Sequence, residues 1–405
     1  MGFQQGLSGL NAAAASLDVI GNNVANAQTV GFKAAATLFA DVYANSLASA
    51  GGMGAGIGVR VAAVQPDLVQ GNIRTTSNPL DLAINGNGFF RVESGGSISY
   101  TRNGQFHLDK DGFIVNASGA RLTGYGVDAG GTLLVANPGP LQVSAQQLQA
   151  TATTEGDIGL NLDARDAVIS APFDISDPTT YNRATAITIY DSLGNSHAMS
   201  TYYVKTAANT WSVYGALDGV AIAGTLGTLA FTTDGTLDTG ATTLPFPVSA
   251  PLANGATTPF AFTLDFANAT QFGSPFAVDT LNQDGFAAGA LAGYAVSDDG
   301  TILGRYSNGQ SRTLGQVMLA AFANPQGLQP LGNNAWGETA ASGQPLPGTP
   351  GTSQFGVLQS GAIEESNVDL TQELVEMITA QRTYQANAQT IKTQDQVLNT
   401  LVNLR

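Results

Sequence analysis

The chain has 405 residues, of which 11% are charged, with 49 glycines, no cysteine and a formal net charge of −15. This composition excludes disulfides, cysteine-ligated zinc and thiol nucleophiles. Because no basic run is present, it also excludes tight binding to nucleic acid. A surface rich in neutral hydrogen-bonding groups fits two classes of protein, one that buries its surface against copies of itself and one that is secreted.

The first predicted element is a helix within residues 1–30. Its apolar residues follow a heptad spacing, which predicts a seam that faces another helix. The seam consists of Phe3, Leu7, Leu10, Ala14, Leu17 and Val24. Asp18 is the only charge before Lys33, so we expect the outer face of this helix to contact protein as well.

The same stretch does not read as a targeting segment. It lacks the positive start and the continuous apolar core of a secretory signal peptide, and no part of the chain approaches the ~20 consecutive apolar residues that span a membrane. We therefore expect no membrane insertion and, if the protein is exported, a route that reads no cleavable leader.

The helix runs into NVANAQTVGFK, residues 23–33. Gly31 permits a sharp exit from a helix, Phe32 can anchor the outgoing chain, and the amides can bond neighbouring backbones without burying a charge. Residues 44–58, ANSLASAGGMGAGIG, are interpreted as a loop or linker. The glycine spacing there does not match a phosphate-binding loop.

The middle of the chain changes to strand periodicity. Alternating apolar residues are separated by Asn-Gly, Asp-Gly and Gly-Asn turns, as in LDLAINGNGFFRV and TAITIYDSLGNSHAMSTYYVK. Residues 146–284 hold thirteen acidic and three basic residues, a net charge of −10 that leaves −5 for the rest (−15 minus −10). This shift in charge predicts a β-domain inserted into another β-domain.

The last predicted element is a helix over residues 366–405. Ser366 or Asn367 is expected to cap it, with Asp369 and Glu373 near the positive end of its dipole. One heptad track follows this helix: Leu374, Met377, Gln381, Tyr384, Ala388, Ile391, Asp395, Leu398 and Val402. We predict that the two terminal seams pair with each other.

The predicted fold is therefore mainly β with long terminal α-helices. It is a nested multi-domain architecture, in which a coiled-coil-like pair of terminal helices is joined to two all-β domains. The predicted parts are a terminal helical domain (1–30 and 366–405), a connecting region (31–60 and 356–365), an inner β-domain (61–145 and 285–355) and an inserted outer β-domain (146–284).

No pattern in the chain predicts an active site. DKDG at 109–112 is interpreted as a hairpin turn, because the later ligands of a calcium loop are missing. His107 and His197 have no acidic partner nearby in sequence and are interpreted as surface or hairpin histidines. The pairs Asp298–Asp299 and Glu364–Glu365 are expected to be solvated. We predict no catalytic residue, no cofactor and no metal site, so the chain is not expected to be an enzyme.

Both ends of the chain carry a family resemblance. NVANAQTVGFK resembles the N-terminal signature of bacterial flagellar rod and hook proteins, with Ala25, Asn26, Thr29, Gly31, Phe32 and Lys33 at its usual positions. The ending ELVEMITAQRTYQANAQTIKTQDQVLNTLVNLR is similar to the same family, and to its hook proteins in particular. LDLAINGNGFFRV and DSLGNSH agree with this assignment.

The resemblance implies an extracellular tube of identical subunits that joins the rod to the filament, bends as a universal joint and encloses the export channel. It implies export by the flagellar type III apparatus, and as partners other copies of the chain, the rod, the hook cap and the hook-filament junction proteins. The implied subunit interface comprises Phe3, Leu7, Leu10, Leu17, Val24, the six signature residues, Leu374, Met377, Gln381, Tyr384, Ala388, Ile391, Leu398 and Val402.

Two other functions stay open from the sequence. A distal-rod protein would share both end motifs but form a straight, stiff structure, although rod proteins are generally shorter. A secreted β-rich adhesin or glycan-binding module would use the acidic insert as its binding face, but would not need a long C-terminal helix.

Overall fold

The computed structural model describes residues 2–42, 56, 58–128, 130–144 and 146–403. Most of the predicted linker at 44–58 therefore lies outside the described residues. The chain forms two compact units, the first made of residues 1–145, 293–305 and 311–405 and the second of residues 146–292 and 306–310.

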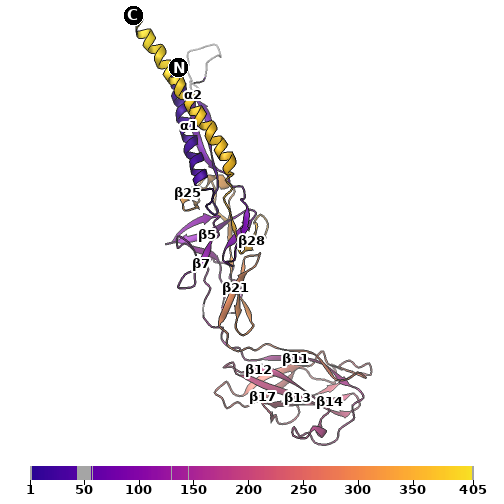
Figure 1. Ribbon diagram of the computed structural model, residues 1–405. Helices are drawn as coiled ribbons and strands as arrows, with labels where there is room; N and C mark the ends of the chain where they lie inside the picture. The colour runs from indigo at the N-terminus through magenta and orange to yellow at the C-terminus, as the bar shows by residue number, and fades with distance from the viewer. Residues whose placement is uncertain (1, 43–55, 57, 129, 145, 404–405) are drawn as a thin grey trace. The chain divides into compact units, whose positions relative to one another are not determined.

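Two helices belong to the first unit, α1 (Gly2–Ala25) and α2 (Leu370–Asn403), and they pack side by side (Figure 1). The carboxylate of Asp369 caps α2 by accepting hydrogen bonds from the backbone N–H groups of Thr371 and Gln372. The predicted caps were wrong, because Ser366 and Asn367 are already engaged before the helix begins. Ser366 accepts from the N–H of Val368 and Asn367 from that of Ala34.

The strands of the first unit form one large sheet and three two-stranded sheets. The small sheets pair β1 (Ala35–Val42) with β2 (Gly58–Pro66), β3 (Ile73–Thr75) with β29 (Ala362–Glu364), and β4 (Leu82–Asn85) with β28 (Val357–Ser360). The 13-stranded sheet has the order β21 (Leu291–Val296), β22 (Thr301–Tyr306), β23 (Ser311–Val317), β9 (Arg121–Tyr125), β5 (Phe89–Ser94), β6 (Ser97–Thr101), β26 (Ala335–Gly337), β25 (Gln329–Gly332). Beside this path lie β7 (Phe106–Leu108), β8 (Ile114–Asn116), β10 (Gly139–Pro140), β24 (Leu319–Ala321) and β27 (Leu346–Gly348).

The second unit is a sandwich of two five-stranded sheets. One contains β11 (Glu155–Asp163), β17 (Phe246–Ala250), β18 (Phe260–Asp265), β19 (Thr270–Phe272) and β20 (Ala277–Gln283). The other contains β12 (Arg183–Tyr190), β13 (Ser196–Ala207), β14 (Thr210–Leu217), β15 (Val220–Ala221) and β16 (Gly227–Ala230). Alternate side chains of both sheets meet in one core around the fully buried Trp211, whose indole N–H donates to Gln271 (2.6 Å).

The predicted fold class, mainly β with long terminal helices, is confirmed. The Asp-Gly turn at 109–112 is confirmed as well, since it joins β7 to β8 with Gly112 at φ +82°. The Asp109 carboxylate accepts hydrogen bonds from the N–H groups of Asp111 and Phe113, as expected of an acidic turn residue.

Candidate assembly site

The two terminal helices run antiparallel and approach each other through glycines. A Cβ atom on Gly6 would lie 3.0 Å from Ile391 Cγ1, and one on Gly9 would lie 2.8 Å from the side-chain amide of Asn387. At the other end of the pair, Asn23 Nδ2 donates to Glu373 Oε1 (2.8 Å). The helix pairing predicted from the two seams is thus present, and Gly6 and Gly9 of α1 pack closely against Ile391 and Asn387 of α2.

This packing makes a prediction about two glycines of the same helix. Gly9→Ala and Gly21→Ala both add a helix-favouring methyl group worth about 1 kcal/mol, but a Cβ on Gly21 would meet nothing within 4 Å. We expect Gly21→Ala to raise the melting temperature of the helices, read by circular dichroism at 222 nm. Gly9→Ala should gain less, because its methyl group requires the side-chain amide of Asn387 to move away. Equal gains in both variants would contradict the packing.

The predicted seam of α1 is left partly open in a single chain. Phe3 and Leu7 are 46% and 44% exposed, and Leu10, Leu17 and Val24 are half-buried. The apolar side chains that α1 buries instead are Ala12, Ala13 and Ile20. The leucine seam therefore retains apolar surface that the chain itself does not cover.

The C-terminal helix is more open still. Among its described side chains, residues 370–400, none is buried, and those half-buried are Glu373, Met377, Ala380, Asn387, Ala388, Ile391 and Gln394. Of the other predicted interface residues, Leu374 (49%), Tyr384 (37%), Leu398 (55%) and Gln381 are exposed, while the side chain of Val402 lies outside the described part. A 34-residue helix with so little cover lacks the apolar burial that normally stabilises a helix.

The signature segment forms the turn that follows α1. Asn26 accepts a hydrogen bond from the hydroxyl of Thr29 (3.1 Å), while Ala25 is exposed and Phe32 half-buried. Gly31 has φ +70°, and a Cβ there would lie 2.6 Å from the backbone N of Asn103. Only glycine combines this backbone conformation with so close an approach.

A buried ionic cluster holds this turn to the β-structure. Lys33 Nζ donates to Glu364 Oε1 (2.6 Å) and Arg102 donates to Glu364 Oε2 (3.2 Å), and the Lys33 and Glu364 side chains have no exposed surface. Burial lowers the pKa of the Lys33 ammonium, although Glu364 opposes this. The expectation that Glu364–Glu365 is solvated was wrong for Glu364. Lys33 and the buried Gly31 thus support the helices from inside the chain.

His197 lies in the β12–β13 hairpin, as interpreted from the sequence, but it is buried there and has two acidic partners. In the second unit, its Nδ1 lies 2.6 Å from Asp218 Oδ2 and its Nε2 lies 3.2 Å from Asp191 Oδ2. Burial lowers the pKa of His197, but the bonds to both carboxylates outweigh it and leave the pKa raised. The cluster joins the turns that end β12 and β14 through the imidazole of His197.

This cluster predicts a pH-dependent stability. Because the folded-state pKa of His197 is raised above 6.5, its contribution is fully present below pH 6.5 and is lost as the pH rises through the folded-state pKa. We expect the thermal stability of the second unit to fall more steeply between pH 6.5 and 9 in the wild type than in His197→Gln, followed by the fluorescence of Trp211 with Trp336 replaced by Phe in both proteins. Parallel profiles in the two proteins would contradict this assignment.

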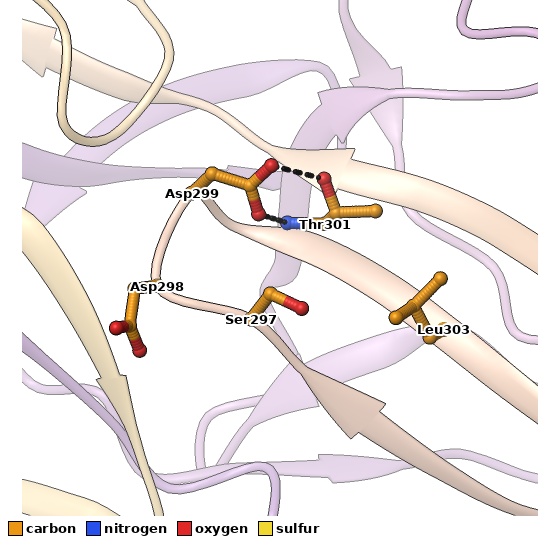
Figure 2. Close-up of a pocket in the computed structure, with 5 residues that line it drawn as sticks. All are labelled: Ser297, Asp298, Asp299, Thr301 and Leu303. Carbon is orange, nitrogen blue, oxygen red and sulfur yellow. Dashed lines mark hydrogen bonds between the residues drawn. The ribbon is translucent and has the colours of Figure 1, made fainter.

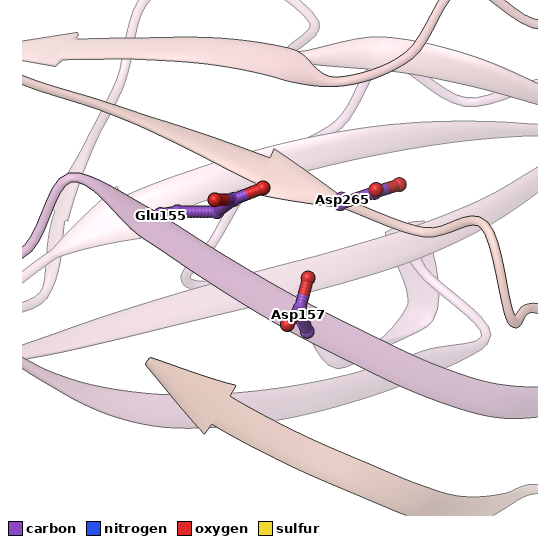
Figure 3. A group of neighbouring side chains, drawn as sticks. All are labelled: Glu155, Asp157 and Asp265. Atoms are coloured by element: carbon purple, nitrogen blue, oxygen red, sulfur yellow. The ribbon is translucent and has the colours of Figure 1, made fainter. Parts of the chain in front are cut away.

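Two surface features carry no function that the structure defines. Figure 2 shows a shallow depression lined by Ser297, Asp298, Asp299, Thr301 and Leu303, where Asp299 is used by its own turn through bonds to Thr301. Figure 3 shows Glu155, Asp157 and Asp265, whose carboxylate oxygens lie within 4.8 Å of one another. Glu155 and Asp157 are exposed. Exposed acidic groups often lie close together without a metal ion, so we assign no metal role to this group.

Several residues of the site were not singled out from the sequence. Gly6 and Gly9 carry a local signal, since glycines are unfavourable inside a helix and imply close packing. Arg102 carries none, and Glu364, which was named only as one of a solvated pair, carries no signal of its burial, because the two residues are 262 positions apart in the chain.

The architecture is that of an axial protein with paired terminal helices, and four family models match it along its length. They are "Flagella basal body rod protein" (residues 3–33), "Flagellar hook protein FlgE/F/G D1 domain" (83–171), "Flagellar basal body protein FlaE D2 domain" (161–286) and "Flagellar basal body rod FlgEFG protein C-terminal" (359–404). These matches define the class, the flagellar rod and hook proteins.

The relatives decide between rod and hook. The chain is 48% identical to the flagellar hook protein FlgE of Salmonella typhimurium (strain LT2) and 47% identical to that of Escherichia coli (strain K12), with 100% of both chains covered in each case. The crystal structure of Helicobacter pylori flagellar hook protein FlgE2 shares the fold at a TM-score of 0.55 and 14% identity, covering 71% of this chain and 99% of that one. This chain belongs to the flagellar hook protein family and is a structural subunit of the flagellum.

Neither helix, over the described residues, has an apolar stretch long enough to cross a membrane.

Proposed function

We propose that the chain assembles with identical copies into the curved, flexible tube of the hook through its paired terminal helices. The observation that carries this proposal is the exposed surface of α2. In the single chain this helix exposes large apolar side chains such as Leu374, Val375 and Ile378. Contiguous apolar surface of this kind is normally covered by protein. A repeating neighbour of the same sequence supplies the cover at every position in a helical polymer.

The residues proposed to serve assembly divide into two groups. The first touches neighbours directly and includes the exposed Phe3, Leu7, Leu374 and Leu398. The second, with Gly31 and Lys33, acts from within the chain by fixing the turn that orients α1. A substitution in the first group should weaken assembly alone, whereas one in the second should also weaken the fold.

The proposed layers of the tube follow the predicted domains. The helical parts, 1–30 and 366–405, line the inner tube around the export channel, and the connecting region (31–60 and 356–365) joins them to the outer layers. The inner β-domain (61–145 and 285–355) and the inserted domain (146–284) form those layers. Sliding between subunits in these layers lets the tube rotate while it stays bent, which is the motion of a universal joint.

The proposed surroundings are those of the hook. The chain leaves the cell through the flagellar type III apparatus and assembles outside it. At its ends the tube meets the rod, the hook cap and the hook-filament junction proteins. The role is structural, and we propose no catalytic step.

Negative-stain electron microscopy tests this function. The full chain, concentrated under salting-out conditions, should form curved tubes, while a variant lacking 1–30 and 366–405 should form none. Straight tubes from the full chain would favour the distal-rod function. Tubes from the truncated variant would refute assembly through the helices, and a soluble, ligand-binding monomer without tubes would favour the adhesin.

A further inference from the structure

Three elements of the first unit meet at one side-chain amide. Asn23, buried near the end of α1, donates from Nδ2 to the carbonyl of Ala35 on β1 and to Glu373 Oε1 on α2, both at 2.8 Å. Its Oδ1 accepts from the N–H of Ala35 (3.0 Å). The amide of Asn23 therefore pairs with the backbone of Ala35, and this pairing fixes its orientation toward Glu373 of α2.

The carboxyl group of Glu373, which accepts the bond from Asn23, lacks a hydrogen-bond donor at its other oxygen. Glu373 Oε2 is buried without a hydrogen-bond partner, and so is Thr37 Oγ1 on β1. A carboxylate oxygen that leaves water without gaining a donor costs free energy, which a proton on that oxygen removes. Burial raises the pKa of Glu373 against the opposing bond from Asn23, and the acidic Glu376 one turn away adds to the rise.

The charged groups on the neighbouring elements do not neutralise this carboxyl. The charge on α1 is Asp18 and the charge on β1 is Asp41, both acidic. The cation on β2 is Arg60, which pairs in register with Ala40, whereas Ala35, the residue of β1 that Asn23 contacts, pairs with Pro66.

The positive end of the α2 dipole favours the ionised form of Glu373. The backbone N–H groups of the first turn, however, already donate to other acceptors. Asp369 accepts from the N–H groups of Thr371 and Gln372, and the N–H of Glu373 donates to the carbonyl of Asp369. The positive end of the helix is thus neutralised by its own cap, not by Glu373.

We propose that α2 docks onto α1 with a proton on Glu373, so that assembly, if the function proposed above holds, takes up one proton per subunit. A carboxyl whose pKa is raised on docking stabilises the docked state most at low pH, and this stabilisation is lost as the pH rises through the docked-state pKa. Subunits would therefore hold their helices together more strongly in mildly acidic surroundings than in alkaline ones.

The test measures the critical concentration for polymerisation of the full chain between pH 4.5 and 8.5, by light scattering. For the wild type we expect a rise of up to about tenfold per pH unit between the pKa of the undocked carboxyl and the higher docked-state pKa, and a plateau above it, as linkage of one proton requires. Glu373→Gln carries a permanently neutral side chain and should assemble with a flat profile. Asp395→Asn, the matched control at an exposed position on the same helix, should keep the wild-type profile.

A second readout does not depend on assembly. The chain has no cysteine, so spin labels attached to Asn11→Cys and Gln389→Cys, both at exposed positions, report the distance between the helices in the monomer. The docked distance should lose population with rising pH in the wild type and not in Glu373→Gln. A chain that never polymerises but shows this difference would refute the assembly function and support the proton switch. The same pH dependence in Glu373→Gln, or none in the wild type by either assay, would overturn the switch.

Discussion

Replacing Glu364 by glutamine should destabilise the first unit by about 3–5 kcal/mol. The substitution keeps the shape of the side chain but removes its charge, which leaves Lys33 and Arg102 buried beside each other without a counter-ion. Breaking a buried ionic cluster on one side costs this much because the remaining charges cannot regain water. The backbone N–H of Gly71 also donates to Glu364 Oε1 (2.9 Å). In the glutamine variant this N–H keeps an oxygen acceptor, so the loss of stability comes from the missing charge alone.

The adjacent residue supplies the control. Glu365 pairs with Arg74 at 2.8 Å, but the two side chains are 42% and 58% exposed, so Glu365→Gln should cost no more than about 1 kcal/mol. Urea unfolding combined with hydrogen exchange of peptides containing β3 and β29 measures both variants. If the two substitutions cost the same, the buried cluster does not hold the terminal segments to the β-structure.

The sequence predicted those features whose signal is local. Heptad spacing defined the two terminal helices, and the turn dipeptides defined the hairpins of the middle region, because backbone conformation there depends on neighbouring residues. The Glu-Glu pair at 364–365 shows the limit of such reasoning. Both residues precede a helix in a polar stretch, and only the folded chain brings Lys33 and Arg102 to the first of them.

The same limit explains His197. Asp191 and Asp218 reach the imidazole because the turns after β12 and β14 lie at the same end of one sheet. Neither the register of these strands nor the depth of the site can be read from DSLGNSH. The partial exposure of the terminal seams has a different cause. A heptad track predicts that a face will be covered, but does not say whether the same chain or another copy covers it.

The exposed face of α2 gives the second large prediction. The double variant Leu374→Ser with Leu398→Ser should raise the critical concentration for polymerisation about 30-fold. Each leucine is about half-exposed in the single chain, and burying the remainder against a neighbour contributes about 1 kcal/mol. Two such losses amount to about 2 kcal/mol, since 1.4 kcal/mol corresponds to a factor of ten.

The monomer should be unaffected by this change, because neither leucine is buried within its own chain. Its free energy of unfolding should stay within about 0.5 kcal/mol of the wild type. Gln385→Ser with Gln396→Ser is the matched control, since both glutamines are exposed on the same helix and bury little apolar surface on assembly. Sedimentation of polymer against monomer gives the critical concentrations, and urea unfolding gives the stability.

An equal loss of assembly in the two double variants would mean that leucine burial does not drive polymerisation. A loss of monomer stability in the leucine variant alone would mean that the chain itself uses this face. Only weakened assembly at unchanged stability fits a helix whose apolar face is completed by the next subunit.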